Sequence, residues 1–361
     1  MTFSKHTYTA TVDVAGVPTE LIPLRGSLTI DEGWAPYIQA DITVAVDAAA
    51  YTALDPREDA RVELTLTQEF SDNGVLTPGT TVTVDLGVRR RTRTPEGDVQ
   101  LELAGDEALA QDRAHLGPWM ERTYGEVALL IIDYLVPIGA ELTSPWPFAS
   151  LEEPDQSIFP GDIIWDVLTP VIEQSGLRLF VDTAREWKLA QVPLNHPQSI
   201  SLGSVPVLQE TTDTVSRDDE SWADSVVVKY DWTDAAGEAH SETDIAWTGS
   251  APSKTKVIER GFAYPGAGAA QHVLNRAQAR GRSIDSVAVS NYSVRPGMQL
   301  TLPVSDGFLS GRVAAVTWSL DDDRMTITPR DLELAHEFAW VLLAPGESWA
   351  DSAPGIPWTT P

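Results

Sequence analysis

The spacing of apolar residues changes twice along this chain, and this change constrains the fold more than any other feature of the sequence. Up to about residue 106, apolar and polar residues alternate, which is the period of a strand with one buried face. Turn-forming clusters such as Asp72-Asn73-Gly74 separate the alternating segments. Short strands at this spacing predict a barrel or a sandwich. The predicted strands cover residues 8–14, 26–30, 38–46, 61–70, 80–91 and 99–104.

Between residues 107 and 197 the apolar spacing becomes helical. Thr123 and Glu126 have the spacing of a capping box, and apolar residues follow at intervals of three and four. A second helix is expected to begin near Asp162, to be kinked or split by Pro170 and to end at Gly176. Two short apolar strands follow, so we predict a small α/β domain here.

Alternation returns at residue 198, with one helix whose apolar face we expect to pack against the sheet. The predicted strands cover residues 205–208, 225–231, 255–259, 287–289, 298–303, 311–320 and 324–328. The predicted organisation is a first β-barrel-like domain (1–106), a small α/β domain (107–197), a second β-barrel-like domain with one helix (198–335) and an extended Trp- and Pro-rich C-terminal tail (336–361). The fold class is therefore mainly β with an α/β insertion.

A Pro-Gly pair precedes a predicted strand in each β region. Pro78-Gly79 leads into one strand pair and Pro296-Gly297 into another. Such a pair can form a tight turn that aims a strand into a barrel. The repetition indicates either an internal duplication or a chance recurrence of a common dipeptide.

The chain is strongly acidic, with 53 Asp and Glu against 25 Lys and Arg and a formal net charge of −28. This balance excludes binding of nucleic acid through its phosphates. An acidic surface would repel passing DNA, so the charge suits a conduit that DNA crosses without specific binding. The chain has no cysteine, which excludes disulfides and thiolate chemistry.

The sequence carries no recognisable catalytic, metal or cofactor motif. The six histidines are scattered, and neither a phosphate-binding loop nor a nucleophile elbow occurs. Asp321-Asp322-Asp323 is read as a solvated turn in preference to a calcium site. We therefore expect no enzyme activity and no cofactor. The amino terminus lacks the apolar core of a signal peptide, and no apolar run is long enough for membrane insertion.

One basic cluster interrupts the acidity, at Arg89, Arg90, Arg91 and Arg93. Alternation along a strand would place Arg90 on one face and the other three on the opposite face. The cluster could protect an edge strand from aggregation, or it could meet acidic residues of a neighbouring subunit. We favour the subunit interface, because edge protection does not need four arginines.

The tail beyond residue 336 contains Trp340, Trp349 and Trp358 at a spacing of nine residues. Its composition cannot form a core of its own. Tryptophan is a frequent anchor of protein interfaces, so we expect these residues to dock a partner protein; the alternative is a tail that folds back on its own domain.

Four segments of the chain resemble the baseplate-hub or tail-tip-hub proteins of tailed phages, in the style of the minor tail proteins of actinobacterial siphophages. They are VDLGVRRRTRTPEGDVQLELAGDEALA (84–110), FPGDIIWDVLTPVIEQSGLRLFVD (159–182), QHVLNRAQARGRSIDSVAVSNYSVRPGMQLTLPV (271–304) and GRVAAVTWSLDDDRMTITPRD (311–331).

This resemblance implies two β-barrel-like hub domains that alternate around a pore in a homotrimer. The implied partners are the tail-tube protein above and a tip fibre or receptor-binding protein below. The implied location is the tail tip of the virion, after assembly in the host cytoplasm.

Twelve tryptophans in a β-rich acidic chain support a second hypothesis, a carbohydrate-binding module that recognises the host cell wall. Its candidate residues are Trp222, Trp232 and Trp247. A hydrolase is a third and weaker hypothesis.

Overall fold

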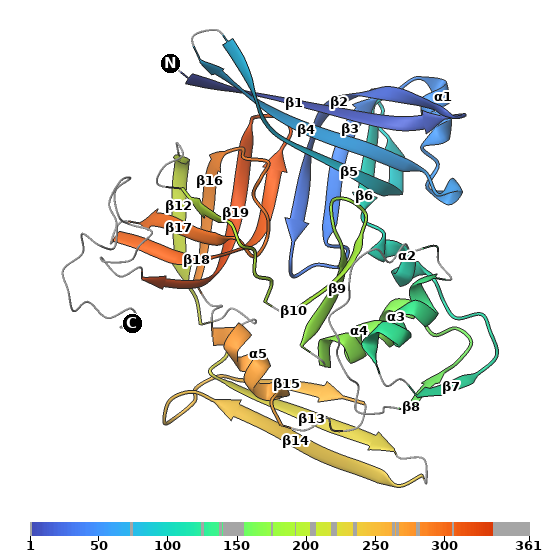
Figure 1. The fold of residues 1–361 in the computed structure, drawn as a ribbon, viewed down its shortest axis with the longest axis vertical. Coiled ribbons are helices and arrows are strands. Elements are labelled where there is room, and N and C mark those ends of the chain that lie inside the picture. Colours follow the sequence, from blue (N-terminus) through green and yellow to red (C-terminus); the bar gives the residue numbers. More distant parts are fainter. Residues whose placement is uncertain are drawn as a thin grey trace.

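The structure is a computed structural model of the whole chain. It describes residues 2–72, 75–123, 126–136, 139, 155–174, 176–191, 193–202, 207–217, 222–233, 237–261, 264, 267–278, 282–304 and 307–334. The predicted anchors Trp340, Trp349 and Trp358 lie outside these residues. Four groups of elements are arranged around the centre of the molecule (Figure 1).

The first β region is a closed six-stranded antiparallel barrel. Pairing follows the order β1-β4-β5-β6-β3-β2, and β2 pairs with β1 to complete the circuit. Alternation builds the core, because Val99, Leu101 and Leu103 of β6 are buried whereas Gln100 and Glu102 between them are exposed. The elements are β1 (Thr2–Val14), β2 (Val17–Asp31), β3 (Ile38–Ala45), α1 (Ala48–Ala53), the 3-10 helix η1 (Pro56–Glu58), β4 (Arg61–Asp72), β5 (Val75–Arg93) and β6 (Val99–Ala104).

The second β region continues the sheet of the first. Its strands are β11 (Ser199–Ser201), β12 (Val207–Val215), β16 (Arg282–Val289), β17 (Gln299–Val304), β18 (Gly307–Ser319) and β19 (Arg324–Leu334). β18 pairs with β2, so one twelve-stranded sheet contains both regions. A single cluster of buried apolar side chains runs through both of them.

Strand β2 joins the two regions because it changes partners along its length. It pairs with β1 over residues 17–21, with β3 over 22–30 and with β18 over 27–31. Gly26 lies just before the β18 pairing begins, where its N–H donates to Asp321 and its carbonyl oxygen accepts from Leu320 N. A Cβ at this position would lie 2.4 Å from the Asp41 carbonyl oxygen of β3, so only glycine permits the approach.

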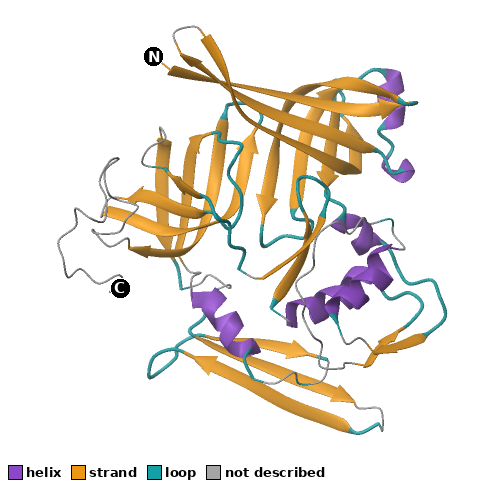
Figure 2. Cartoon of the chain, in the orientation of Figure 1, coloured by secondary structure: helices purple, strands orange, loops and turns teal. Residues whose placement is uncertain are grey.

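A small α/β unit lies beside the barrel, where Figure 2 shows most of the helical residues. It contains α2 (Glu107–Asp112), β7 (Met120–Thr123), α3 (Val127–Leu135), β8 (Asp155–Ile158), α4 (Ile164–Gln174), β9 (Leu177–Val181) and β10 (Trp187–Gln191). The unit has its own apolar core, which includes fully buried Leu130, Ile131 and Leu168. Helices α2, α3 and α4 and the β9–β10 hairpin enclose it.

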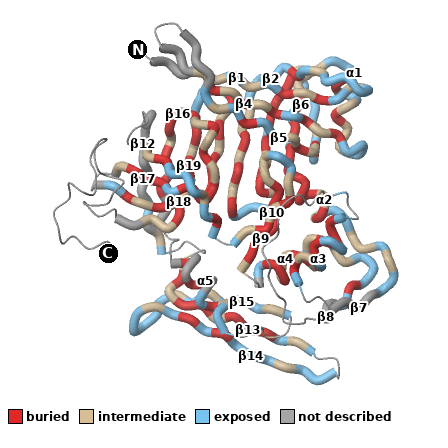
Figure 3. Tube along the Cα trace, in the orientation of Figure 1, coloured by how far each residue is buried: buried red, intermediate tan, exposed pale blue. Residues whose placement is uncertain are grey.

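A second small unit interrupts the second β region. Strands β13 (Ser225–Thr233), β14 (Ala239–Trp247) and β15 (Thr255–Arg260) form a three-stranded sheet in the order β14-β13-β15, separate from the large one. Helix α5 (Ala269–Gln278) packs on one face through Ala270 and Leu274. The core side chains are buried while much of the rest of the unit is exposed (Figure 3).

The predicted class, mainly β with an α/β insertion, is confirmed. One local prediction was wrong. Thr123 does not cap a helix: it lies in β7 opposite Asp155, and α3 begins after Glu126 without a side-chain cap. Pro170 does not split helix α4, which continues to Gln174, and Leu168 and Ile172 on either side of the proline are buried.

We predict that Gly26→Ala lowers the free energy of unfolding by about 1–3 kcal/mol, because the added methyl group overlaps the β3 backbone. The matched control is Gly87→Ala in β5, where a Cβ would meet nothing closer than 3.7 Å. That variant should be neutral or more stable by up to about 1 kcal/mol. Urea denaturation of both variants measures the difference, and equal effects would contradict the assignment of Gly26 as the point of close approach.

Candidate functional site

The arginine-rich segment lies at the end of β5, beyond the last residue that pairs with β4. A bulge between Val88 and Arg90 breaks the predicted alternation, so Arg89 does not share a face with Arg91 and Arg93. The side of this segment away from β6 is covered by the connection through α1 and η1, since Val88 N donates to Ala60 O and Arg91 donates to Tyr51 O. The structure therefore does not support the reading of these arginines as protection of a bare strand edge.

Each arginine of the segment has a partner within the chain. Arg89 makes a bidentate ion pair with Asp112 of α2, and Arg90 pairs with Glu102 at 3.0 Å. Arg91 and Arg93 lie over the ring of Tyr51, with guanidinium carbons 4.0 and 5.2 Å from its centroid. Arg90 keeps 66% of its side chain exposed. A contact with a neighbouring subunit thus stays a prediction, and Arg90 is accessible for it.

An alternating ring of charges ties the β9–β10 hairpin to the barrel. Arg61 pairs with Asp85 at 2.9 Å and with Asp106 at 2.8 Å, and Arg185 pairs with the same two carboxylates at the same two distances. Asp106 is the most buried member, with 9% of its side chain exposed. Because each charge faces two of opposite sign, the ring fixes the hairpin turn against the start of β4, the middle of β5 and the residue before α2.

Glu107 makes a second connection between the barrel and the α/β unit. Its side chain is buried, and Oε1 accepts from the backbone N–H groups of Tyr37 at 3.0 Å and Val181 at 2.9 Å. Oε2 has no hydrogen-bond partner among the described residues. Burial raises the pKa of Glu107, and the two backbone hydrogen bonds and the Arg178 guanidinium oppose this only in part.

A buried ion pair joins the two β regions. Arg330 of β19 makes a bidentate contact with Glu32, which follows β2, and both side chains are at most 5% exposed. Arg330 also donates to Leu194 O at 2.7 Å, in the segment that follows β10. Three parts of the chain therefore meet at one guanidinium group.

The two Pro-Gly pairs occupy different environments. Pro296-Gly297 forms a tight turn in which Met298 N donates to Arg295 O and Gly297 has a φ of 87°. Pro78 lies inside β5 and pairs with Glu69 of β4, next to a shift in the register of the two strands. Pro78-Gly79 therefore marks a bulge within a strand and not a turn. This difference removes one argument for an internal duplication.

The three candidate sugar-binding tryptophans do not form one platform. Trp247 and Trp232 lie at opposite ends of the β13–β14 pair, opposite Ser225 and His240 respectively, roughly 23 Å apart along the strand. Their register places them on opposite faces of the sheet. Trp232 stacks on His240 at 5.1 Å, and Trp222 lies 5.9 Å from the Lys254 ammonium group. The arrangement gives no single aromatic surface for a polysaccharide.

Within the described part of the chain, no group of three or more His, Asp and Glu side chains could hold a metal ion. Asp321-Asp322-Asp323 has local roles instead, because Asp321 accepts from Gly26 N and Asp322 pairs with Arg324. Among the described residues there is also no helix with the length and apolar character of a membrane span.

Sequence reasoning missed the contacts that hold the units together. Glu32 and Arg330 are 298 residues apart in sequence, and Arg185 is one of three charged residues in the polar turn at 182–186. No local pattern marks any of them. The one available signal was Arg330 itself, a charged residue two positions after the predicted strand at 324–328.

Three tail proteins are among the solved structures that share this fold. The tail protein from Neisseria meningitidis MC58 superposes with a TM-score of 0.58 at 12% identity, over 90% of this chain and 96% of that chain. The 43 kDa tail protein of prophage MuSo2 from Shewanella oneidensis gives 0.58 at 12% identity, over 89% and 98%. Prophage tail protein gp18 from Listeria monocytogenes EGD-e gives 0.54 at 9% identity, over 90% and 94%.

The chain has the fold of phage tail proteins. The match covers nearly the whole of both chains, so it includes the α/β unit and the three-stranded unit as well as the barrel. A chain of the Francisella PdpA–VgrG complex also shares the fold, with a TM-score of 0.52 and 66% of that chain covered. At the level of sequence, no protein-family model and no curated protein matches the chain.

We predict that Glu107→Gln changes the pH dependence of stability. Because the folded-state pKa of Glu107 is raised, its stabilising contribution is present at acid pH and is lost as the pH rises through that pKa. The variant keeps a carbonyl oxygen for the two N–H donors and has no charge to bury, so its stability relative to wild type should increase with pH.

Urea denaturation from acid to neutral pH measures this effect. Glu63→Gln, an exposed position on β4, is the matched control and should run parallel to wild type. A Glu107→Gln curve parallel to wild type would contradict the prediction.

Proposed function

We propose that this chain is a structural hub subunit of a phage tail tip or baseplate and that it has no catalytic activity. The observation that carries the proposal is the fold match to three phage tail proteins over nearly the full length of each chain. The absence of a metal-binding group among the described residues is compatible with a structural role.

In this proposal three copies form a ring that ends the tail tube. Each copy contributes its barrel and its second β region, so six β regions surround the pore. The continuous sheet supports this arrangement, because the β2–β18 pairing and the Glu32–Arg330 ion pair hold the two regions in one fixed orientation. A ring of alternating regions needs such a fixed angle within each subunit.

We further propose that DNA passes through the ring without specific binding. A net charge of −28 gives repulsion between the wall and the phosphates, which lowers friction during ejection. The tail-tube protein would contact the ring from above and a tip fibre or receptor-binding protein from below, with the complete assembly located in the virion.

The residues proposed for docking the distal partner are Trp340, Trp349 and Trp358. Large aromatic side chains bury much area at low entropic cost, so a few of them can anchor an interface. The composition of the tail and the nine-residue spacing of its tryptophans support this role.

We predict that the purified chain, alone or with its neighbouring tail proteins, forms a ring with three times the mass of one chain. Mass photometry and negative-stain electron microscopy measure the assembly, and immunogold labelling of virions should mark only the tail tip. Label along the tail shaft or on the capsid would contradict the hub proposal. Because some rings form only on their neighbours, a monomer of the isolated chain is tested again in the presence of the tube protein.

A chain lacking residues 340–361 should form the same ring but lose a component of the tail tip. The control replaces the three tryptophans by alanine within the full-length chain and should give the same loss. Mass spectrometry of purified tails identifies the missing protein. An unchanged tip composition in both variants would contradict the docking role of the tail without affecting the ring.

A further inference from the structure

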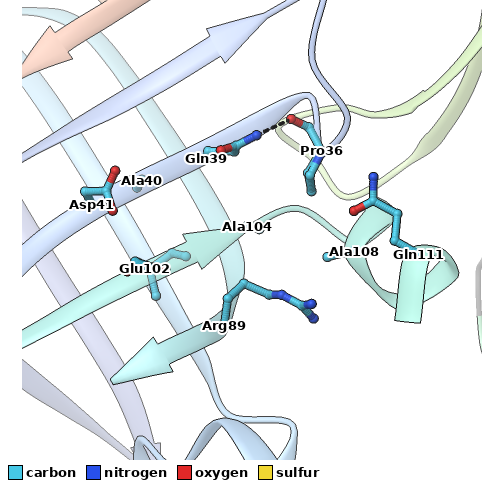
Figure 4. Close-up of a pocket in the computed structure, with 10 residues that line it drawn as sticks. Pro36, Gln39, Ala40, Asp41, Arg89, Glu102, Ala104, Ala108 and Gln111 are labelled. Carbon is cyan, nitrogen blue, oxygen red and sulfur yellow. Dashed lines mark hydrogen bonds between the residues drawn. The ribbon is translucent and has the colours of Figure 1, made fainter. Parts of the chain in front are cut away.

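A polar pocket with a volume of about 420 Å³ lies on the outer wall of the barrel, between β3, β6 and helix α2 (Figure 4). Gln39 and Asp41 of β3 project from the same strand face, and Glu102 lies directly opposite Asp41 on β6. Gln111 of α2 approaches from the other side. Neither the sheet pairing nor the apolar core accounts for this combination of side chains.

The amide side chains of the pocket already use their donors. Gln39 Nε2 donates to Pro36 O at 3.1 Å, and Gln111 Nε2 donates to Ala35 O at 2.9 Å. Since a carbonyl oxygen can only accept, both amide orientations are fixed by their partners. The two Oε1 atoms are therefore left as acceptors.

The charges of the pocket are compensated except for one. Arg89 is held by Asp112, with Nη2 and Oδ1 2.8 Å apart, and Arg90 pairs with Glu102 at 3.0 Å. The exposed carboxylate of Asp41 makes no hydrogen bond or ion pair with any of the residues that the structure describes. Burial raises the pKa of Asp41, and the neighbouring Glu102 raises it further.

Asp41 and Glu102 also form an unfavourable pair in the free chain, because like charges directly opposite each other destabilise adjacent strands. One uncompensated carboxylate and two amide oxygens together offer acceptors for a group that carries several donors and one positive charge. A guanidinium group has this chemistry, with five N–H donors in a plane and a permanent charge.

We propose that this pocket binds an arginine side chain presented by another protein chain. The surface is open to solvent on the outside of the barrel, and the volume exceeds what a bare ion needs. A protein other than a second copy fits the charge balance, because this chain is strongly acidic and a basic partner complements it. The inference does not depend on the proposed hub function.

The test follows the titration of Asp41 by carbon NMR of a chain labelled at aspartate, with the signal assigned through Asp41→Asn. The peptide acetyl-Gly-Arg-Gly-amide should lower the titration midpoint of Asp41 by about one pH unit at saturation. The same peptide with citrulline in place of arginine has no charge and should leave the midpoint unchanged. No shift with the arginine peptide overturns the proposal, and an equal shift with MgCl2 at the same ionic strength overturns it in favour of a general cation site.

A second measurement distinguishes a binding role from a structural one. Asp41→Asn removes the repulsion with Glu102, so it should raise the folding equilibrium constant of the isolated chain by about two- to fivefold. Glu20→Gln removes one exposed charge from the barrel wall outside the pocket, where the residue opposite it is Thr11, so this variant should leave the folding equilibrium constant unchanged. A loss of stability in Asp41→Asn would mean that Asp41 serves the fold, and the proposal would fail.

Discussion

The pairing of β2 with two sets of partners is the constraint on which the rest of the structure depends. Its first residues close the barrel against β1, and its last residues carry the sheet onward to β18. At this junction Leu28 lies opposite Trp318, and both side chains are fully buried. Two β regions that could have formed separate cores therefore share one, and the angle between them is set by backbone hydrogen bonds.

Polar contacts then fix the other units against this sheet. The Glu32–Arg330 pair joins the β regions and the segment after β10. The ring of Arg61, Asp85, Asp106 and Arg185 holds the β9–β10 hairpin to the barrel. The buried Glu32–Arg330 pair is costly to break, because loss of one partner leaves the other charged and desolvated. These contacts specify orientation, which is what a subunit of an ordered assembly requires.

The sequence predicted the parts of the fold that depend on local periodicity. Alternation revealed the barrel strands, and helical spacing revealed α3 and α4. It could not reveal the β2–β18 pairing, because the partners lie 288 residues apart in sequence at Thr29 and Thr317. The three-stranded unit was predicted as part of the second barrel for the same reason, since alternation identifies a strand but not the sheet to which it belongs.

The candidate site shows the same division between local pattern and tertiary context. The cluster of arginines was visible in sequence, but its partners Asp112, Glu102 and Tyr51 come from three other elements. Asp41 was one acidic residue among many, and its lack of a partner became apparent only when β3, β5, β6 and α2 were brought together. Composition indicated an acidic surface, whereas only the fold identified an uncompensated charge within it.

The central claim is that both β regions form one cooperative body through β2, and native-state hydrogen exchange tests it most directly. The amide protons of residues 27–31 and 315–319 should open with the same free energy as those of the barrel core strands β4 and β5, in one global unfolding event. If the protons of β18 and β19 open at a clearly lower free energy than those of the barrel, the two regions are separate units and the account is contradicted.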